Sequence, residues 1–248
     1  MKADPSAQRA LLDLATIDTQ QARLAHRLRS LPEIAQLGEL NTQRLAAAEA
    51  VVAVETRLSD LDLDARRIEG DITPARERLE RNEQRSNDGS VSNPKALRGL
   101  LDEIEHLKGR IARLEDDQLD VIEQIETETA ERDRLVDGRT RVENRMRELM
   151  ASRDAAAAEI TAEATSLDTD RADLLTRVPT DVAALYAKLA ERQGTGAAEL
   201  VGRRCSGCGL EVDIADLRRL SSAPDDEVLR CEECGRILVR TTQSDLLT

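Results

Sequence analysis

The chain has 248 residues, a net charge of -13 and 34% charged residues, yet no Phe, no Trp and a single Tyr. Aromatic side chains supply much of the apolar surface that ordinary globular cores bury, so this composition argues against a compact domain with a roomy apolar pocket. Leu, Ile, Val and Ala combined with abundant Glu, Arg and Asp are typical of long helices and coiled coils. We therefore expect no small-molecule substrate and no enzyme active site.

The beginning of the chain, MKADPSAQRALLDLATIDTQ, lacks the run of roughly 7–15 apolar residues that a secretory signal needs. No stretch approaches the roughly 20 apolar residues of a membrane helix. We expect a cytoplasmic protein without membrane contact, in which thiols stay reduced and disulfides are not favoured. The acidic total disfavours phosphate binding over most of the surface, so any nucleic-acid contact would need a local basic patch.

Apolar residues repeat in alternating steps of three and four over three successive segments, 14–35, 47–79 and 97–125, and less regularly up to residue 167. Sustained heptads of this kind predict paired helices that share an apolar seam. The fold class is therefore mainly α, built on a long coiled coil.

Two breaks interrupt the helical pattern. SLPE, residues 30–33, reads as a capping box with Pro in the first turn and predicts a helix restart or a kink. SNDGSVSNP, residues 86–94, combines turn formers with Asn93 as N-cap and Pro94 at the first helical position. Because segments 5–85 and 94–178 have similar lengths, we predict an antiparallel helical hairpin in which residue i faces about residue 178 − i.

Pro179 ends this hairpin. TDVAALYAKLAERQG predicts a short amphipathic helix capped by Thr180 or Asp181 and closed by the glycines of GTG, 194–196. Short β-type stretches, LVGRR, EVLRC and ILVRTT, then flank the cysteines. The predicted domains are a hairpin over 1–178 with its tip loop at about 86–94, a connecting helix and linker over 179–196, and a small module over 197–248.

The four cysteines form two Cys-x-x-Cys pairs, Cys205 with Cys208 and Cys231 with Cys234. Two such pairs complete the tetrahedral four-sulfur site of one structural Zn²⁺. Gly209 and Gly235 follow each pair, where the chain turns back with positive φ. A thioredoxin-like dithiol is the rival interpretation, but it needs a single pair near a βαβ pattern. Catalytic zinc is disfavoured because such sites keep an open position and usually include His or carboxylate ligands.

VPTDVAALYAKLAER, CSGCGLEV, CEECGRILV and the SNPKAL stretch at 92–97 together resemble the bacterial proteins that combine a coiled-coil hairpin with a C4-type zinc ribbon. The resemblance spans nearly the whole chain, and the Cys-Gly-Arg-Ile-Leu motif is its most specific part. The chain departs from the family at Val239, where an aromatic residue commonly follows Ile-Leu. The resemblance implies an adaptor that binds regulators, such as an alternative sigma factor or secretion components, and in some relatives RNA.

The hairpin tip is the first candidate for a partner-binding surface. Residues 76–98 hold six basic and four acidic side chains, whereas residues 99–133 hold four basic and twelve acidic ones. A basic tip on an acidic coiled coil would suit an acidic protein or a phosphate. The alternative is that these charges are the solvated flanks of a coiled coil. The candidate residues are Lys95, Arg98, Arg85 and Arg81.

The ribbon supplies candidates for nucleic-acid binding, although ten acids outnumber seven bases between residues 194 and 248. It has no aromatic platform for base stacking, so a protein-docking role is favoured over this alternative. Tyr186 is expected to pack the short helix against its neighbours, and His26 and His106 to be solvated helix residues. The candidate nucleic-acid contacts are Arg203, Arg204, Arg218, Arg219 and Arg236.

Overall fold

A computed structural model describes residues 1–245 of the chain. It divides into two compact units: unit 1 combines the segment 1–34 with the residues from Ala151 onward, and unit 2 is Ala35–Met150. In the part of the chain that the structure describes, no helix is both long enough and apolar enough to cross a membrane.

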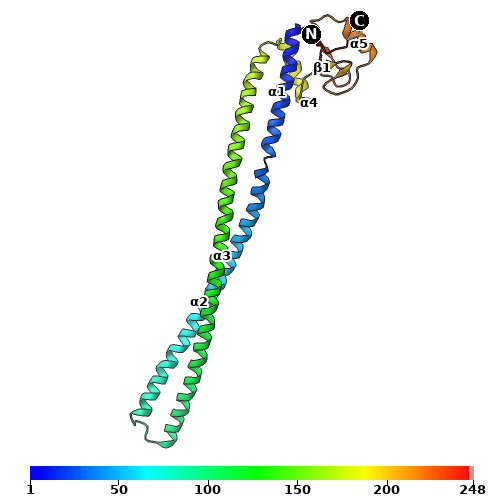
Figure 1. The fold of residues 1–248 in the computed structure, drawn as a ribbon. Coiled ribbons are helices and arrows are strands. Elements are labelled where there is room, and N and C mark those ends of the chain that lie inside the picture. The colour runs from blue at the N-terminus through cyan, green and yellow to red at the C-terminus, as the bar shows by residue number, and fades with distance from the viewer. Residues whose placement is uncertain (246–248) are drawn as a thin grey trace. The chain divides into compact units, whose positions relative to one another are not determined.

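Unit 2 is an antiparallel pair of helices, formed by most of α2 (Pro32–Asn87) and by the first part of α3 (Pro94–Leu175) (Figure 1). Both helices bury their heptad positions against each other. One apolar cluster centres on Ile68, Ile72 and Val121, and a second contains Ala75, Leu107 and Ile111. The predicted coiled-coil hairpin is confirmed, and its seam consists of the aliphatic residues that the sequence repeats.

The predicted register of the hairpin is wrong by about two helical turns. It would place residue 57 opposite residue 121, but Arg57 forms an ion pair with Glu128 at 2.9 Å. It would place residue 69 opposite residue 109, but Glu69 accepts a hydrogen bond from Gln118 at 2.9 Å. The prediction used only the ends of the helices, whereas the interlocking of apolar side chains along the seam sets the register.

The tip loop has the predicted cap. The Asn93 side-chain oxygen accepts hydrogen bonds from the backbone N–H groups of Lys95 at 2.9 Å and Ala96 at 3.3 Å, and α3 begins at Pro94. On the other side, α2 ends at Asn87, and Gly89 turns the chain with a φ of 73°. These contacts fix where α3 starts and hold its first turn at the tip.

Unit 1 begins with α1 (Pro5–Arg29), which Asp4 caps through the N–H groups of Ser6 and Ala7. The chain restarts as a helix at Pro32, as predicted, but the predicted capping box is not formed. The Ser30 hydroxyl donates to the His26 carbonyl at 2.9 Å, so this residue closes α1 instead of opening α2. α1 packs on the last part of α3 through a cluster that includes Leu24, Leu31 and Ile160.

The helix α4 (Thr180–Gln193) follows the end of α3. Its N-cap is Pro179, and no side chain caps it, so the predicted cap at Thr180 or Asp181 is wrong. The Asp181 carboxylate instead accepts a hydrogen bond from the N–H of Val182. At the other end, Gly194 adopts a φ of 80° as the left-handed C-cap that the sequence predicts.

The C-terminal part of unit 1 is a small four-stranded sheet with the order β2-β1-β4-β3. The strands are β1 (Ala197–Val201), β2 (Arg204–Cys205), β3 (Leu229–Arg230) and β4 (Ile237–Val239), and β1 pairs parallel with β4. Successive side chains of β4 point to opposite faces. Ile237 and Val239 join the cluster of α1 and α4, while Leu238 joins the cluster of α5 and the cysteines.

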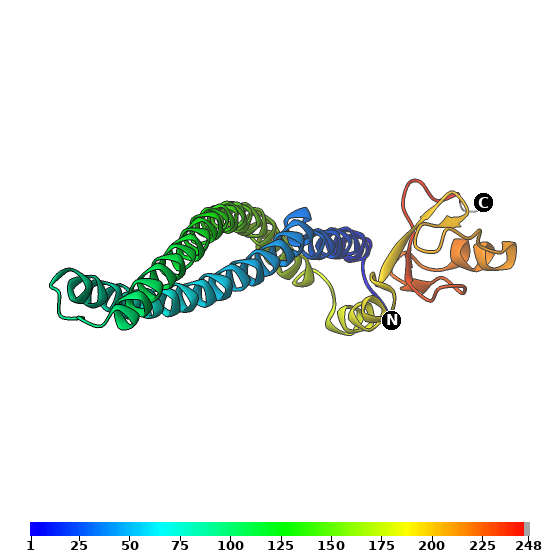
Figure 2. The same ribbon diagram turned by 90° about the horizontal axis from the view of Figure 1, so that it is seen from below.

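Two features of this region have no counterpart in the sequence prediction. The helix α5 (Ile214–Ser222), visible beside the strands in Figure 2, packs Leu217 and Leu220 on the sheet. The first residues of the chain also pair with the segment before β3, because the Ala3 N–H donates to the Asp226 carbonyl at 2.8 Å. Buried Gln8 donates its side-chain amide to the carbonyls of Ala3 and Asp225.

Candidate functional site

The four cysteines converge to a single point in unit 1. Their sulfur atoms all lie within 4.8 Å of one another, with 3.9 Å between Cys205 and Cys234 and 4.0 Å between Cys208 and Cys231. A tetrahedral zinc ion with bonds of about 2.3 Å requires sulfur–sulfur distances of about 3.8 Å. The four thiols therefore fit one Zn²⁺ and fill its coordination shell, which makes the site structural.

Two equivalent backbone turns present these sulfurs. In the first, the Gly209 N–H donates to the Cys205 carbonyl at 2.8 Å, and in the second the Gly235 N–H donates to the Cys231 carbonyl at the same distance. The two glycines have φ values of 74° and 72°, as the sequence predicts. An arginine just before each pair closes the turn: Arg204 binds the Gly209 carbonyl, and Arg230 binds the Gly235 carbonyl.

Burial and hydrogen bonds shift the pKa of three of the thiols in different directions. It raises the pKa of Cys205 to about 12 and also raises the pKa of Cys231. Burial acts in the same direction on Cys234, but hydrogen bonds from the backbone N–H and side chain of Arg236 outweigh it and lower the pKa of this thiol to about 7. Zinc binds the thiolates and displaces their protons. The free energy of this binding holds the four cysteines together in a small fold.

Arg236 holds the second cysteine pair against the end of α4. Its guanidinium donates to the carbonyls of Gln193 at 2.8 Å, Thr195 at 3.2 Å and Gly207 at 3.3 Å. The Gln193 side chain in turn donates to the Cys234 carbonyl. Arg236 is therefore part of the frame of the zinc site.

The other ribbon arginines proposed as nucleic-acid contacts do not form one cationic surface. Arg203 pairs with Asp245 at 3.3 Å, and Arg204 lies 3.8 Å from Glu211. Arg219 pairs with both Asp216 and Glu232. Within residues 1–245, Arg218 is the member of this set that is exposed and free of an ion pair or hydrogen bond.

The cations around the tip differ in whether they are paired. Arg76, Arg78 and Lys108 each form an ion pair across the two helices. Arg81 pairs with Glu77 of its own helix at 3.6 Å. The side chains of Arg85, Lys95 and Arg98 are exposed, and no acidic group of the described chain pairs with them. The structure thus leaves three cations available around the tip loop.

A buried polar group that the sequence did not reveal lies between α1, α3 and α4. The Tyr186 hydroxyl donates to one oxygen of Asp18 at 2.6 Å, and Arg171 donates to the other at 2.8 Å. The tyrosine is fully buried, and burial together with the hydrogen bond to Asp18 raises its pKa. The two hydrogen bonds compensate the negative charge of the Asp18 carboxylate where α1, α3 and α4 meet. Tyr186 packs its helix against these neighbours, as expected.

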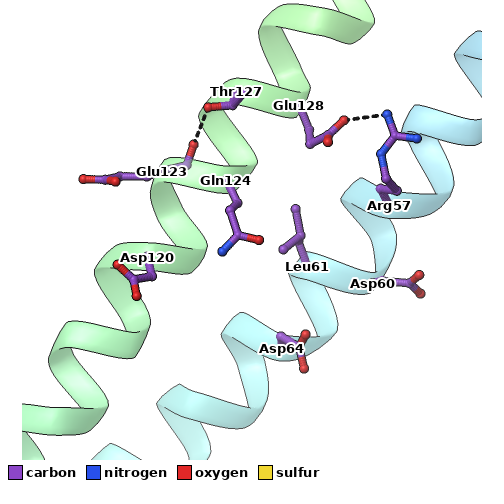
Figure 3. Close-up of a pocket in the computed structure, with 9 residues that line it drawn as sticks. All are labelled: Arg57, Asp60, Leu61, Asp64, Asp120, Glu123, Gln124, Thr127 and Glu128. Carbon is purple, nitrogen blue, oxygen red and sulfur yellow. Dashed lines mark hydrogen bonds and ion pairs between the residues drawn. The ribbon is translucent and has the colours of Figure 1, made fainter.

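A polar groove of about 510 Å³ runs between α2 and α3 in unit 2 (Figure 3). Its walls are mainly carboxylates, and Leu61 is an apolar residue in its lining. The Arg57–Glu128 ion pair bridges the two helices at one end. Small-molecule pockets are mostly apolar, so this groove has the character of a charged coiled-coil flank.

Comparisons with known proteins agree with this architecture. The model of the CT398-like coiled coil hairpin domain matches residues 14–194, and that of the C4-type zinc ribbon domain matches residues 204–238. An uncharacterised protein of Mycobacterium tuberculosis is 34% identical over 244 residues, which cover 97% of this chain and 98% of the relative.

Solved structures give the same result. A protein from Mycobacterium smegmatis has a TM-score of 0.86 and 35% identity, covering 97% of this chain and all of that one. CT398 from Chlamydia trachomatis has a TM-score of 0.67 at 18% identity, covering 95% and 98% of the two chains, which shows a shared fold. The chain therefore belongs to the family of CT398-like coiled-coil hairpin proteins that end in a C4-type zinc ribbon.

Proposed function

We propose that this protein is a non-enzymatic cytoplasmic scaffold that binds a partner protein through the tip of its coiled coil. The observation that carries the proposal is the set of unpaired tip cations, Arg85, Lys95 and Arg98. Neighbouring cations such as Arg76 and Lys108 are paired across the two helices, whereas these three, like Arg110 and Arg113, are exposed without an ion pair and remain available for an acidic partner. The zinc site is remote in sequence from the tip and serves to hold the ribbon.

A pull-down from the cytosol of the source organism tests this proposal. The wild-type chain is compared with a K95E/R98E variant, and each lysate is divided into nuclease-treated and untreated halves. We expect a discrete protein that survives nuclease and is lost with K95E/R98E. A matched R141E/R147E variant, which reverses two exposed α3 cations away from the tip, should retain that protein.

Binding of nucleic acid through basic residues of the tip and the ribbon is the alternative function. The exposed Arg218 favours it, whereas the ion pairs of Arg203, Arg204 and Arg219 reduce the charge that a phosphate would meet. Affinity that falls steeply with salt, recovery of RNA, and loss of captured proteins after nuclease would replace the scaffold proposal with this one.

A further inference from the structure

The outward face of α3 in unit 2 carries charges of opposite sign at two separate places. Lys95 and Arg98 lie near the tip, and Asp120 and Glu123 follow 25 residues later in each case. Because 25 residues are about seven helical turns, Asp120 lies on the face of Lys95, and Glu123 lies on the face of Arg98. All four side chains are exposed.

This face lies off the apolar seam with α2, although Asp120 and Glu123 also line the groove between the two helices (Figure 3). Arg98 is nine residues from buried Leu107, and Asp120 is nine residues from buried Ile111. Nine residues are about two and a half turns, so each charged residue lies on the side opposite the seam. Figure 3 shows the Glu123 carboxylate directed away from α2. Across residues 1–245, none of the four charged groups forms an ion pair or a side-chain hydrogen bond.

We propose that α3 binds α3 of a second copy of this chain in antiparallel orientation, with Lys95 and Arg98 of one copy facing Glu123 and Asp120 of the other. Both pairings have residue 109 as their midpoint, so one twofold axis satisfies them together. A self-complementary surface of this kind is what a symmetric dimer requires. The overlapping segment, residues 95–123, lies entirely within unit 2.

The residue on the proposed twofold axis is Gly109, which is exposed in the middle of α3. No heavy atom lies within 4 Å of the position where a Cβ atom would be, so packing within the chain does not require glycine. Glycine is also unfavourable inside a helix. Its lack of a side chain would let two copies of α3 approach closely at the point where they cross.

Exposed leucines extend the surface with apolar area. Leu101 is 47% exposed and Leu119 is 59% exposed, both high values for leucine in a helix. They lie 18 residues apart, which is five turns, so they share one edge of the face. They are about equally far from Gly109, and the twofold axis therefore brings Leu101 of one copy close to Leu119 of the other.

The remaining charges along the overlap do not cancel this complementarity. Glu105 would face Arg113 of the second copy, which is favourable, whereas Asp102 would face Asp116, which is not. Along the face, each copy thus contributes three attractive charge pairs and one repulsive charge pair. The contact is electrostatic at its ends, so raised ionic strength should weaken it.

Sedimentation velocity of the full chain over a concentration series tests the dimer with a charge-swap design. Wild type should dimerise at low salt, whereas K95E/R98E and D120K/E123K should each remain monomeric at the same concentration. A mixture of the two variants should dimerise, because reversed tips meet reversed carboxylates in one half of the contact and native tips meet native carboxylates in the other half. The fourfold variant should recover a homodimer, because in that variant reversed tips meet reversed carboxylates in both halves of the contact. R141E/R147E is the matched control and should behave as wild type.

Cross-linking provides a second readout of the axis. A Gly109→Cys variant with zinc bound should be linked to itself by a short bismaleimide. Gly138→Cys should not be linked, because it lies 29 residues farther along the same face and outside the overlap. A wild-type chain that stays monomeric throughout, or a mixture that fails to dimerise, would overturn the proposal.

This inference is independent of the proposed scaffold function, although both use Lys95 and Arg98. The D120K/E123K variant separates them, because it keeps the tip cations and removes the dimer. If it still captures the partner protein, the scaffold function holds without self-association. Conversely, if the chain dimerises but captures no partner protein, the antiparallel contact holds and the scaffold function does not.

Discussion

Replacing Gly196 with Ala would place a Cβ atom 2.6 Å from the Tyr186 ring carbon Cδ2, with the Tyr186 carbonyl in contact as well. The backbone and ring cannot both withdraw, because Tyr186 is fully buried and bound to Asp18. We expect a loss of about 1–3 kcal/mol in the free energy of unfolding of unit 1, measured by urea denaturation. Gly70→Ala is the control: its Cβ meets open space in a helix, so stability should be unchanged or slightly higher.

The raised pKa of Tyr186 predicts a pH dependence that absorbance can follow without ambiguity, since this is the only tyrosine of the chain. Burial favours the neutral phenol in the folded state, whereas an unfolded tyrosine ionises near pH 10. The stabilisation is therefore complete below about pH 10 and is lost as the pH rises above it. Tyrosinate absorbance should appear only together with loss of helical circular dichroism. Ionisation near pH 10 in a chain that stays folded would contradict the buried contact.

The residues of the zinc site could be predicted from the sequence, whereas those of the buried polar group could not. Two thiols separated by two residues can chelate an ion with local backbone alone, so spacing reveals the ligands. Asp18, Arg171 and Tyr186 come from three helices, and no local pattern connects a carboxylate with a tyrosine 168 residues later.

At the scale of the helices, the cap of α3 can be tested directly. Asn93→Ala removes the oxygen that accepts from the N–H groups of Lys95 and Ala96. We expect unit 2 to lose about 1 kcal/mol of stability, with faster hydrogen exchange at these two amides. Ser92→Ala, which changes the neighbouring exposed residue, should leave both unaffected. Unchanged exchange in Asn93→Ala would mean that the cap does not hold the first turn.

Predictions of helices succeeded where a local signal was strong. Asn93, Pro94 and Gly194 set helix ends through their own conformational preferences, so these helix ends can be predicted from the sequence. The helix α5 was missed because it is nine residues long and buries only Leu217 and Leu220, although Asp213 before it is a typical N-cap. The hairpin register was wrong because many heptad pairings are nearly equivalent by pattern, and only side-chain packing distinguishes them.

At the scale of the whole chain, removal of zinc should affect the two units differently. Ile237 and Val239 share one cluster with Leu11, Leu14 and Tyr186, so loss of the metal should loosen α1 and α4 as well as the ribbon. With a chelator at neutral pH, hydrogen exchange should increase in β1–β4 and α5, then in α4 and the beginning of α1. Exchange within unit 2 should stay unchanged.

Cys205→Ser should reproduce the effect of the chelator, because it removes one of the four ligands. Metal analysis should find one zinc per chain in the wild type and a reduced content in this variant. If the ribbon kept its protection after complete loss of zinc, the ion would not be the source of its stability.

The pairing of residues 1–3 with residues 226–228 also constrains the order of folding. Contacts between residues so far apart in sequence form late in folding, because bringing the two segments together costs much chain entropy. On the ribosome, the segments of unit 2 can pair as soon as the first part of α3 has emerged, while the beginning of α1 gains its last contacts only after the ribbon has been made. The beginning of α1 is thus synthesised before unit 2 but reaches its final neighbours after unit 2 has formed.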